Sequence, residues 1–324
     1  SINEPLFTGP NPDGKVNTYA GIIIDEARRR GIGIEVLDAE NGFFRLTFGG
    51  RTVTCRESLS ELSSAVAMSR CDDKAVTRKV LESVGLKTPA QVVVNDSTDI
   101  LSFLSSYGRV VVKPAKGEQG EGVYVDLRTE DEIKAAIVKA SQLCDKVIME
   151  EYVHGEDLRI IVINEEVVAA AVRKPASICG TGTHTISELI EKQSRRRAKA
   201  TKGESKIPLD EETQRCLELE GYALEDTLPK DKVIQVRKTA NLHTGGTIHD
   251  VTTNIHPALI EAAITGARAL EIPVVGFDFL VPSVEGDEYV IVEANERPGL
   301  ANHEPQPTAE KFIDFLFPHS KQHD

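Results

Sequence analysis

Two segments near the C-terminal end carry oxygen-bearing side chains at strand spacing. The stretch "GFDFLVP" sets Asp278 between apolar residues, and "YVIVEANERPG" sets Glu293 and Asn295 two residues apart. Because side chains alternate along a strand, Glu293 and Asn295 point to the same face. Acids on a buried face are costly unless a cation neutralises them, and carboxylate and amide oxygens suit Mg²⁺. We therefore predict that these three residues bind a metal, although strand-end hydrogen bonding would explain one acid alone.

A glycine-rich loop follows a lysine that ends a β-branched run. In "VVVKPAKGEQGEGVYV", Lys113 precedes Gly117, Gly120 and Gly122. Glycines let backbone N–H groups converge on an anion, and a lysine on a buried strand needs a partner such as a phosphate. The pattern is not a P-loop, which needs Gly-Lys-Ser/Thr before a helix. Lys74 lies in the first turn of a predicted helix, where anions are favoured, although by itself a solvated lysine explains it better.

A third segment, "VIMEEYVHGED", ends a predicted strand with two acids. Glu150, Glu151 and Val153 offer carboxylate and backbone partners for an adenine edge, and Asp157 follows closely enough to accept from a ribose hydroxyl. A hairpin-like connection with surface acids explains the same residues. The segment therefore indicates a nucleotide only in combination with the others.

The elements that position these residues mix strands and helices without strict alternation. Such a pattern predicts an α+β fold with antiparallel sheets and helices on one face. We divide the chain into a small N-terminal α/β unit (1–70), whose first strand could lie upstream of Ser1, a second part with the glycine-rich lid (71–155), and a third with the predicted metal ligands (156–324). Residues 194–206, within the basic stretch near 190–206, are predicted to leave a helix as a mobile excursion.

Local signals place several element ends. The predicted positions are an N-cap at Asn17, a hairpin turn at Gly49–Gly50, a helix starting near Asp72 or Asp73, an N-cap at Ser97, a capping box of Thr129 with Glu132, and two strands meeting at Asn164–Glu165.

Composition narrows the function classes. A net charge of -13 argues against a broad nucleic-acid surface. Five cysteines occur without a CxxC pair, and no histidines follow HExxH spacing, so neither a zinc site nor a disulfide framework is predicted. No apolar run is long enough to span a bilayer and no signal peptide leads the chain, so we expect a cytoplasmic protein without membrane partners.

The order of the singled-out residues adds a resemblance. From about Asp72 to the C-terminus, the chain resembles the ATP-grasp fold of carboxylate–amine ligases. The segments "GTGTHTISELIE", "KIPLDEE", "GYALEDTLP" and "RKTANLHTGGTIHDVT" resemble the cyanophycin synthetase and bifunctional glutathione synthetase branch, which is related to RimK. The lead-in "GGRTVTCRESLSELSSAVAMSRCDDKAVTRKVL" looks most similar to dipeptide ligases of osmolyte synthesis. One departure is Thr181, which stands where the branch has Asp between two glycines.

The resemblance implies that ATP lies between two antiparallel sheets. Lys74 and Lys113 would neutralise α- and β-phosphate oxygens, and the loop 117–122 would close over the β- and γ-phosphates. The implied contacts to the nucleoside come from Glu150, Glu151, Val153 and Asp157. Two Mg²⁺ ions, for which Mn²⁺ could substitute, would be held by Asp278, Glu293 and Asn295.

The reaction that the resemblance implies passes through an acyl phosphate, which an amine then attacks. Arg237 would stabilise the acyl phosphate or the tetrahedral intermediate. Asn241 would belong to a substrate or phosphate loop with Gly245 and Gly246, and Arg297 would hold a substrate carboxylate by its planar fork. For each arginine a structural salt bridge is an equal alternative, and Arg159 and Arg173 are secondary candidates.

The expected partners are amino-acid or peptide substrates, and relatives suggest a homo-oligomer. The alternatives are a cyanophycin- or glutathione-type ligase, and a regulatory ATP-grasp module that binds ATP without catalysis.

Overall fold

The computed structural model describes residues 16–117, 121–201, 203 and 205–321. The chain forms two compact units. The first combines Ser1–Thr88, Leu158–Ala171 and Asp250–Asp324, and the second combines Pro89–Asp157 and Val172–His249. The boundaries predicted at residues 70 and 155 remain predictions.

The first unit begins with a helix and an antiparallel sheet. Helix α1 (Thr18–Arg29) starts at Asn17, whose side chain accepts from the N–H of Ala20 as predicted. The sheet has the order β1 (Gly33–Asp38), β2 (Phe43–Phe48), β3 (Arg51–Arg56) and β4 (Leu59–Ser60). Gly49 and Gly50 both have positive φ, as a tight turn between β2 and β3 requires, which confirms the predicted hairpin.

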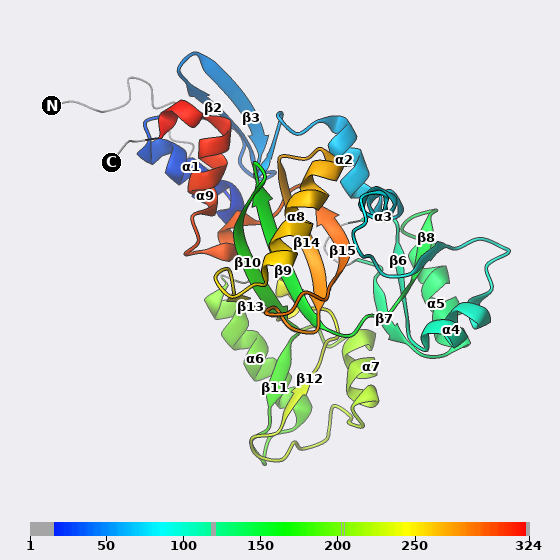
Figure 1. The fold of residues 1–324 in the computed structure, drawn as a ribbon. Coiled ribbons are helices and arrows are strands. Elements are labelled where there is room, and N and C mark those ends of the chain that lie inside the picture. Colours follow the sequence, from blue (N-terminus) through cyan, green and yellow to red (C-terminus); the bar gives the residue numbers. More distant parts are fainter. Residues whose placement is uncertain (1–15, 118–120, 202, 204, 322–324) are drawn as a thin grey trace. The chain divides into compact units, whose positions relative to one another are not determined.

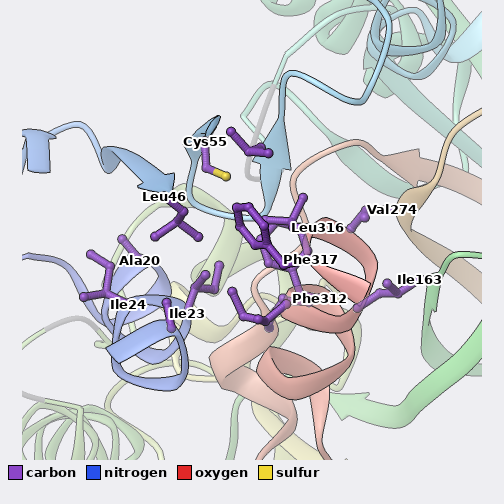
Figure 2. Close-up of a cluster of buried hydrophobic side chains, with 14 of the residues drawn as sticks. Ala20, Ile23, Ile24, Leu46, Cys55, Ile163, Val274, Phe312, Leu316 and Phe317 are labelled. Atoms are coloured by element: carbon purple, nitrogen blue, oxygen red, sulfur yellow. The ribbon is translucent and has the colours of Figure 1, made fainter. Parts of the chain in front are cut away.

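A hydrophobic core joins this sheet to helices α1 and α9 (Thr308–Leu316). Helix α9 packs beside α1, and Figure 2 shows side chains from α1, β2 and α9 converging. Ile23, Leu46 and Phe312 are fully buried there. Two 3₁₀ turns flank α9, namely Leu300–His303 and Pro318–Ser320. Burial of this apolar surface is the main contribution that stabilises the packing of α1 and α9 on the sheet.

A five-stranded sheet carries the C-terminal strands. Its order is β13 (Thr247–Asp250), β10 (Glu166–Lys174), β9 (Glu156–Ile163), β14 (Val274–Val281) and β15 (Val290–Asn295). Asn164 and Glu165, both at positive φ, form the turn between β9 and β10 as predicted. Helix α8 (Pro257–Leu270) packs on β14 (Figure 1), and a Cβ at Gly266 would lie 2.9 Å from the Phe277 ring. Glycine there allows the helix to approach the strand closely.

Two helices precede the second unit. The first, α2 (Ala65–Asp72), lies in the lead-in segment, where no separate helix is predicted from the sequence. The second, α3 (Lys74–Ser83), begins at Asp73, whose carboxylate accepts from the N–H groups of Ala75 and Val76. This start agrees with the predicted helix at Asp72 or Asp73, and Lys74 is its first residue.

The second unit contains a four-stranded sheet covered by two helices. The strand order is β5 (Gln91–Val93), β8 (Val147–Glu151), β6 (Val110–Pro114) and β7 (Tyr124–Leu127), with antiparallel pairs throughout. The helices are α4 (Ile100–Tyr107) and α5 (Glu130–Ser141). Thr129 and Glu132 form the predicted capping box of α5. The cap predicted at Ser97 is wrong, because Asp99 caps α4.

The remainder of this unit surrounds a two-stranded sheet. Strands β11 (Ser177–Cys179) and β12 (Val233–Gln235) pair antiparallel, beside α6 (Ile186–Ala200), α7 (Glu211–Leu219) and the 3₁₀ turn η1 (Leu242–Thr244). The prediction that the chain leaves the helix at residue 194 is wrong, because α6 continues to Ala200 and Ser194 is buried. Arginine, lysine and alanine are good helix formers, and this propensity outweighs the polar composition. Within the described residues, no helix is long and apolar enough to cross a membrane.

Candidate functional site

The three predicted metal ligands lie on one strand pair of the first unit. Strands β14 and β15 are antiparallel, with Asp278 opposite Glu293 and Gly276 opposite Asn295. Asp278, Glu293 and Asn295 therefore share a face of the sheet. The Asn295 Nδ2 donates to the carbonyl of Gly276 over 3.3 Å, which leaves the amide oxygen as the atom able to bind a cation.

A basic side chain meets each carboxylate. The Nζ of Lys74 lies 3.3 Å from Glu293 Oε1, and Arg159 on β9 donates to Asp278. Lys74 is only 7% exposed, so this lysine is not the solvated surface residue that its position alone suggested. The structure thus brings Lys74 together with Glu293, one of the predicted metal ligands.

The donors on this face fit a hard divalent cation. All three predicted ligands offer oxygen, which suits Mg²⁺ bound jointly by a protein and a phosphate substrate. Among the described residues, no group of three or more His, Cys, Asp and Glu side chains is arranged to hold a metal. A metal here would therefore need the Asn295 oxygen or a substrate oxygen beside the two carboxylates.

Lys113 and Glu150 form a buried ion pair in the second unit. Register places Lys113 opposite Ile148, and Glu150 opposite Val111, so both side chains project from the same face of the β6–β8 pair. The Lys113 Nζ lies 3.0 Å from Glu150 Oε1, and Gln91 donates to Oε2 over 2.8 Å. Burial of both side chains makes each charge depend on the other.

The ladder between β5 and β8 stops at the next residue, Glu151. The N–H of Glu151 donates to the carbonyl of Ala90, but the N–H of Ala90 donates to the Glu151 carboxylate over 2.9 Å. The Glu151 carbonyl therefore does not receive the ladder bond that Ala90 would supply in a continuing pair.

The predicted ribose-binding acid is held by an arginine. Arg173 Nη2 lies 2.7 Å from Asp157 Oδ1, and Arg173 Nε donates to the same oxygen over 2.8 Å. Arg173 thus fixes Asp157, whereas the other secondary candidate, Arg159, fixes Asp278.

Arg237 lies beside the start of α7. Its Nη1 donates to Asp210 over 2.5 Å and to Thr213 Oγ1 over 3.1 Å, and its side chain is buried. Within the described part of the chain, its Nε is buried and makes no hydrogen bond. A buried donor without an acceptor is unfavourable by about 1–3 kcal/mol, so an oxygen at this nitrogen would be stabilised.

The loop after Arg237 folds around Asn241. Its side chain accepts from the N–H of His243, and its carbonyl accepts from the N–H of Gly246. A Cβ at Gly245 would lie 2.4 Å from Ile207, and one at Gly246 would lie 2.7 Å from the Asn241 carbonyl. Close packing therefore explains both glycines without a ligand.

The remaining predicted residues are Arg297 in the first unit and the lid glycines in the second. Arg297 Nε is 3.7 Å from Glu57 in the first unit. Gly122 has φ +70° and a Cβ there would meet Leu143 at 2.6 Å, while Gly117 has φ +143°. Gly120 lies outside the described residues, as does the centre of the predicted lid.

A cavity of about 810 Å³ adjoins α6, a size that suits a small molecule. It is lined by Ile190, Glu191, Ser194, Arg195, Ala198, Lys206, Ile207, Pro208, Leu209 and His243.

A charged cluster on β7 was not predicted from the sequence. Asp126 is fully buried, has φ 59° and binds Arg109 and Arg128. Burial alone would raise its pKa, but hydrogen bonds from the two arginines hold the pKa of Asp126 at about 2. An acid between the apolar residues of "YVDL" was the available signal.

Comparison with known proteins identifies the fold. Residues 71–181 match the family model of the RimK-like ATP-grasp domain. The chain is 31% identical to a cyanophycin synthetase of Trichormus variabilis, over 95% of this chain and 36% of that protein. It is 29% identical to a bifunctional glutathione biosynthesis protein of Listeria innocua, over 91% of this chain and 41% of that protein. The chain thus spans well under half the length of these curated relatives.

Solved structures agree on the architecture. A bifunctional glutathione synthetase from Pasteurella multocida superposes with a TM-score of 0.65 at 24% identity, over 94% of this chain and 44% of that one. A D-alanine–D-alanine ligase from Bacillus anthracis superposes with a TM-score of 0.51 at 15% identity, over 80% of this chain and 70% of that one. The predicted α+β fold of the ATP-grasp type is confirmed by these structures.

Proposed function

We propose that the chain is an ATP-dependent ligase that joins the carboxylate of an amino acid or peptide to an amine through an acyl phosphate. The observation that carries this proposal is the pairing of Asp278 with Glu293 on one face of a strand pair, with Asn295 beside them. In a chain with the ATP-grasp fold, such a set of oxygens favours catalysis with a nucleotide and a divalent cation.

Asp278, Glu293 and Asn295 are the proposed ligands of two Mg²⁺ ions, for which Mn²⁺ could substitute. When bound, such ions neutralise charge that develops on a transferred phosphoryl group. Lys74 adds a fixed positive charge near Glu293, and Arg159 orients Asp278.

The proposed nucleotide contacts in the second unit have local support. Lys113 is proposed to supply a buried positive charge for a phosphate, and its ion pair with Glu150 orients the ammonium group. The Glu151 carbonyl can accept from an adenine amino group, and the Val153 N–H is proposed to donate to the ring. Asp157, held by Arg173, can accept from a ribose hydroxyl. The predicted lid over the phosphates stays a proposal.

The proposed chemistry has two steps. A carboxylate oxygen of the substrate attacks the γ-phosphorus, the bond to the bridging oxygen breaks, and ADP leaves. The amine nitrogen then attacks the acyl carbon, phosphate departs with the acyl C–O electron pair, and the nitrogen loses a proton to solvent. No protein nucleophile takes part, so orientation and charge stabilisation must supply the rate enhancement.

Three residues are proposed to act on the acyl group. The buried Nε of Arg237 would find its acceptor in an oxyanion of the acyl phosphate or tetrahedral intermediate. Asn241 is proposed to contact substrate through its loop. Arg297, which is 3.7 Å from Glu57, is proposed to hold a substrate carboxylate by its planar fork.

The proposed specific reaction is the joining of N-acetylglutamine to glutamine, which rests on the resemblance of the lead-in segment alone. Ligation of the cyanophycin or glutathione type is the alternative within the same class, and the named relatives support the class as a whole. The alternative from another class is an ATP-binding module without catalysis.

The proposal is tested by measuring ADP release from ATP by the purified chain with Mg²⁺. Pairs of a carboxylate and an amine are screened as substrates. We expect ADP release that requires a carboxylate and rises further with the matching amine. Hydroxylamine in place of the amine should trap the acyl phosphate as a hydroxamate. Tight ATP binding without ADP release for any pair would instead support the binding module.

A further inference from the structure

Strand β7 contains a bulge that turns two consecutive carbonyls toward one side. Val110 pairs with Leu127 and Val112 pairs with Tyr124, so β7 has one more residue than β6 over this span. The additional turn occurs at Asp126, whose φ of 59° lies in the left-handed region. Successive carbonyls of a regular strand point in opposite directions, and the left-handed residue breaks this alternation.

A single arginine on α7 binds both carbonyls. The Nη1 of Arg215 donates to the carbonyl of Val125 over 3.0 Å, and its Nη2 donates to the carbonyl of Asp126 over 2.6 Å. A planar guanidinium can make two such bonds at once, whereas an ammonium group cannot reproduce the fork. Arg215 therefore attaches α7 to the bulge in a defined orientation.

The carboxylate of Asp126 also links the bulge, through Arg109, to Tyr152 at the end of β8. Asp126 accepts from Arg109, whose guanidinium lies 4.3 Å from the centre of the Tyr152 ring. The N–H of Tyr152 also donates to the carbonyl of Arg109 over 3.0 Å. The bulge is thus bonded to the residues that flank the proposed adenine contacts.

Arg237 is bound at the N-terminal end of α7, less than two turns from Arg215. Asp210 caps α7 by accepting from the N–H of Thr213, and both residues accept from Arg237. One short helix therefore connects the bulge on β7, through Arg215, to the guanidinium of Arg237.

We propose that Arg215 is a positioning residue that sets the location of Arg237 by fixing α7 to the β7 bulge. This inference rests on the proposed function, in which Arg237 stabilises the acyl phosphate or tetrahedral intermediate. Arg215 acts through α7 and touches no substrate.

Arg215→Gln and Arg215→Lys test the proposal in the full chain, with kcat and KM for ATP measured separately. Both variants should lower kcat about tenfold or more, because a displaced catalytic group loses its alignment, while KM for ATP changes less than about twofold. The Arg215→Lys variant should not restore kcat, since lysine keeps the positive charge but cannot donate to both carbonyls as the planar guanidinium does.

A double-mutant cycle distinguishes positioning from general destabilisation. If Arg215 acts through Arg237, the R215Q/R237Q double variant should be no slower than R237Q alone. If the fold-decrease in kcat of the double variant equals the product of the fold-decreases of R215Q and R237Q, the proposal is overturned.

Hydrogen exchange supplies a readout that does not require turnover. R215Q should speed amide exchange in residues 208–213 without affecting β6, whereas unchanged exchange there would overturn the proposal. The matched control is Lys139→Gln. It removes the exposed ion pair of 3.1 Å that Lys139 on α5 forms with Glu211, which lies on α7 as Arg215 does. This control should match wild type, and an equal effect in K139Q would also count against Arg215. If no substrate pair gives turnover, the proposed function fails while exchange still decides the positioning role.

Discussion

Lys113 and Glu150 form an ion pair of 3.0 Å on adjacent strands, with each side chain only 4% exposed. Burying two charges is costly, and their attraction and hydrogen bonds must offset the loss of hydration. Removal of one partner therefore leaves a charge without compensation in the sheet of the second unit.

Lys113→Met should lower the free energy of unfolding by about 3–5 kcal/mol, measured by urea denaturation. The Lys113→Met/Glu150→Met double variant should recover most of this loss, because apolar side chains can replace a buried pair. Lys134→Met is the control, since it breaks an exposed helical pair with Glu130 and should change stability by less than about 0.5 kcal/mol. A double variant that is less stable than the single would contradict this explanation.

Glu293→Gln and Asp278→Asn should each lower the rate of ADP release about 100-fold or more, because each removes a charged ligand proposed for Mg²⁺. Higher Mg²⁺ should restore part of the rate if the loss is in metal affinity. Glu288→Gln alters an exposed acid between the same two strands and should leave the rate unchanged. Near-normal turnover in Glu293→Gln would remove that residue from the metal site.

Short-range signals predicted element ends well wherever one hydrogen bond decides the end. The Asn17 cap and the Thr129–Glu132 capping box depend on residues within one helical turn. The cap predicted at Ser97 failed because Ser97 Oγ donates to Asn95 in a turn, and Asp99 caps the helix instead. Two neighbouring polar residues competed for one role, which spacing alone could not resolve.

The contacts within the candidate site could not be predicted from local sequence patterns, because they join residues far apart in the chain. Arg159 and Asp278 are 119 positions apart, yet they form one ion pair. The order of motifs identified the ATP-grasp fold, but the burial of Lys113 against Glu150 emerged only from strand register. Asp126 was missed because its function is to bind arginines from neighbouring strands and turns, and its left-handed backbone has no glycine to mark it.

The Asp126 carboxylate should make stability depend on pH at the acid end. Burial would raise its pKa, but Arg109 and Arg128 lower it to about 2 from an ordinary value of 3.8. Because the folded pKa is depressed, the stabilisation is complete above about pH 4 and is lost as pH falls toward 2, amounting to roughly 2 kcal/mol.

Urea denaturation of wild type and Asp126→Asn between pH 6 and pH 2.5 measures this dependence. Asparagine tolerates a left-handed backbone, so the variant should report mainly the charge. We expect the stability difference between the two proteins to shrink as the pH falls below 4. A difference that stays constant over this range would show that the ionised carboxylate contributes no stability.

Gly245→Ala distinguishes packing from ligand binding in the loop of Asn241. Gly245 has φ +92° and a Cβ there would lie 2.4 Å from Ile207, whereas Gly221 has φ +80° with nothing within 4 Å. Both substitutions incur the left-handed penalty of about 1 kcal/mol, and overpacking adds about 1–3 kcal/mol at Gly245 alone. Gly245→Ala should therefore be clearly less stable than Gly221→Ala in urea. If the two variants are equally stable and only Gly245→Ala loses turnover, the glycine serves a bound substrate rather than the packing against Ile207.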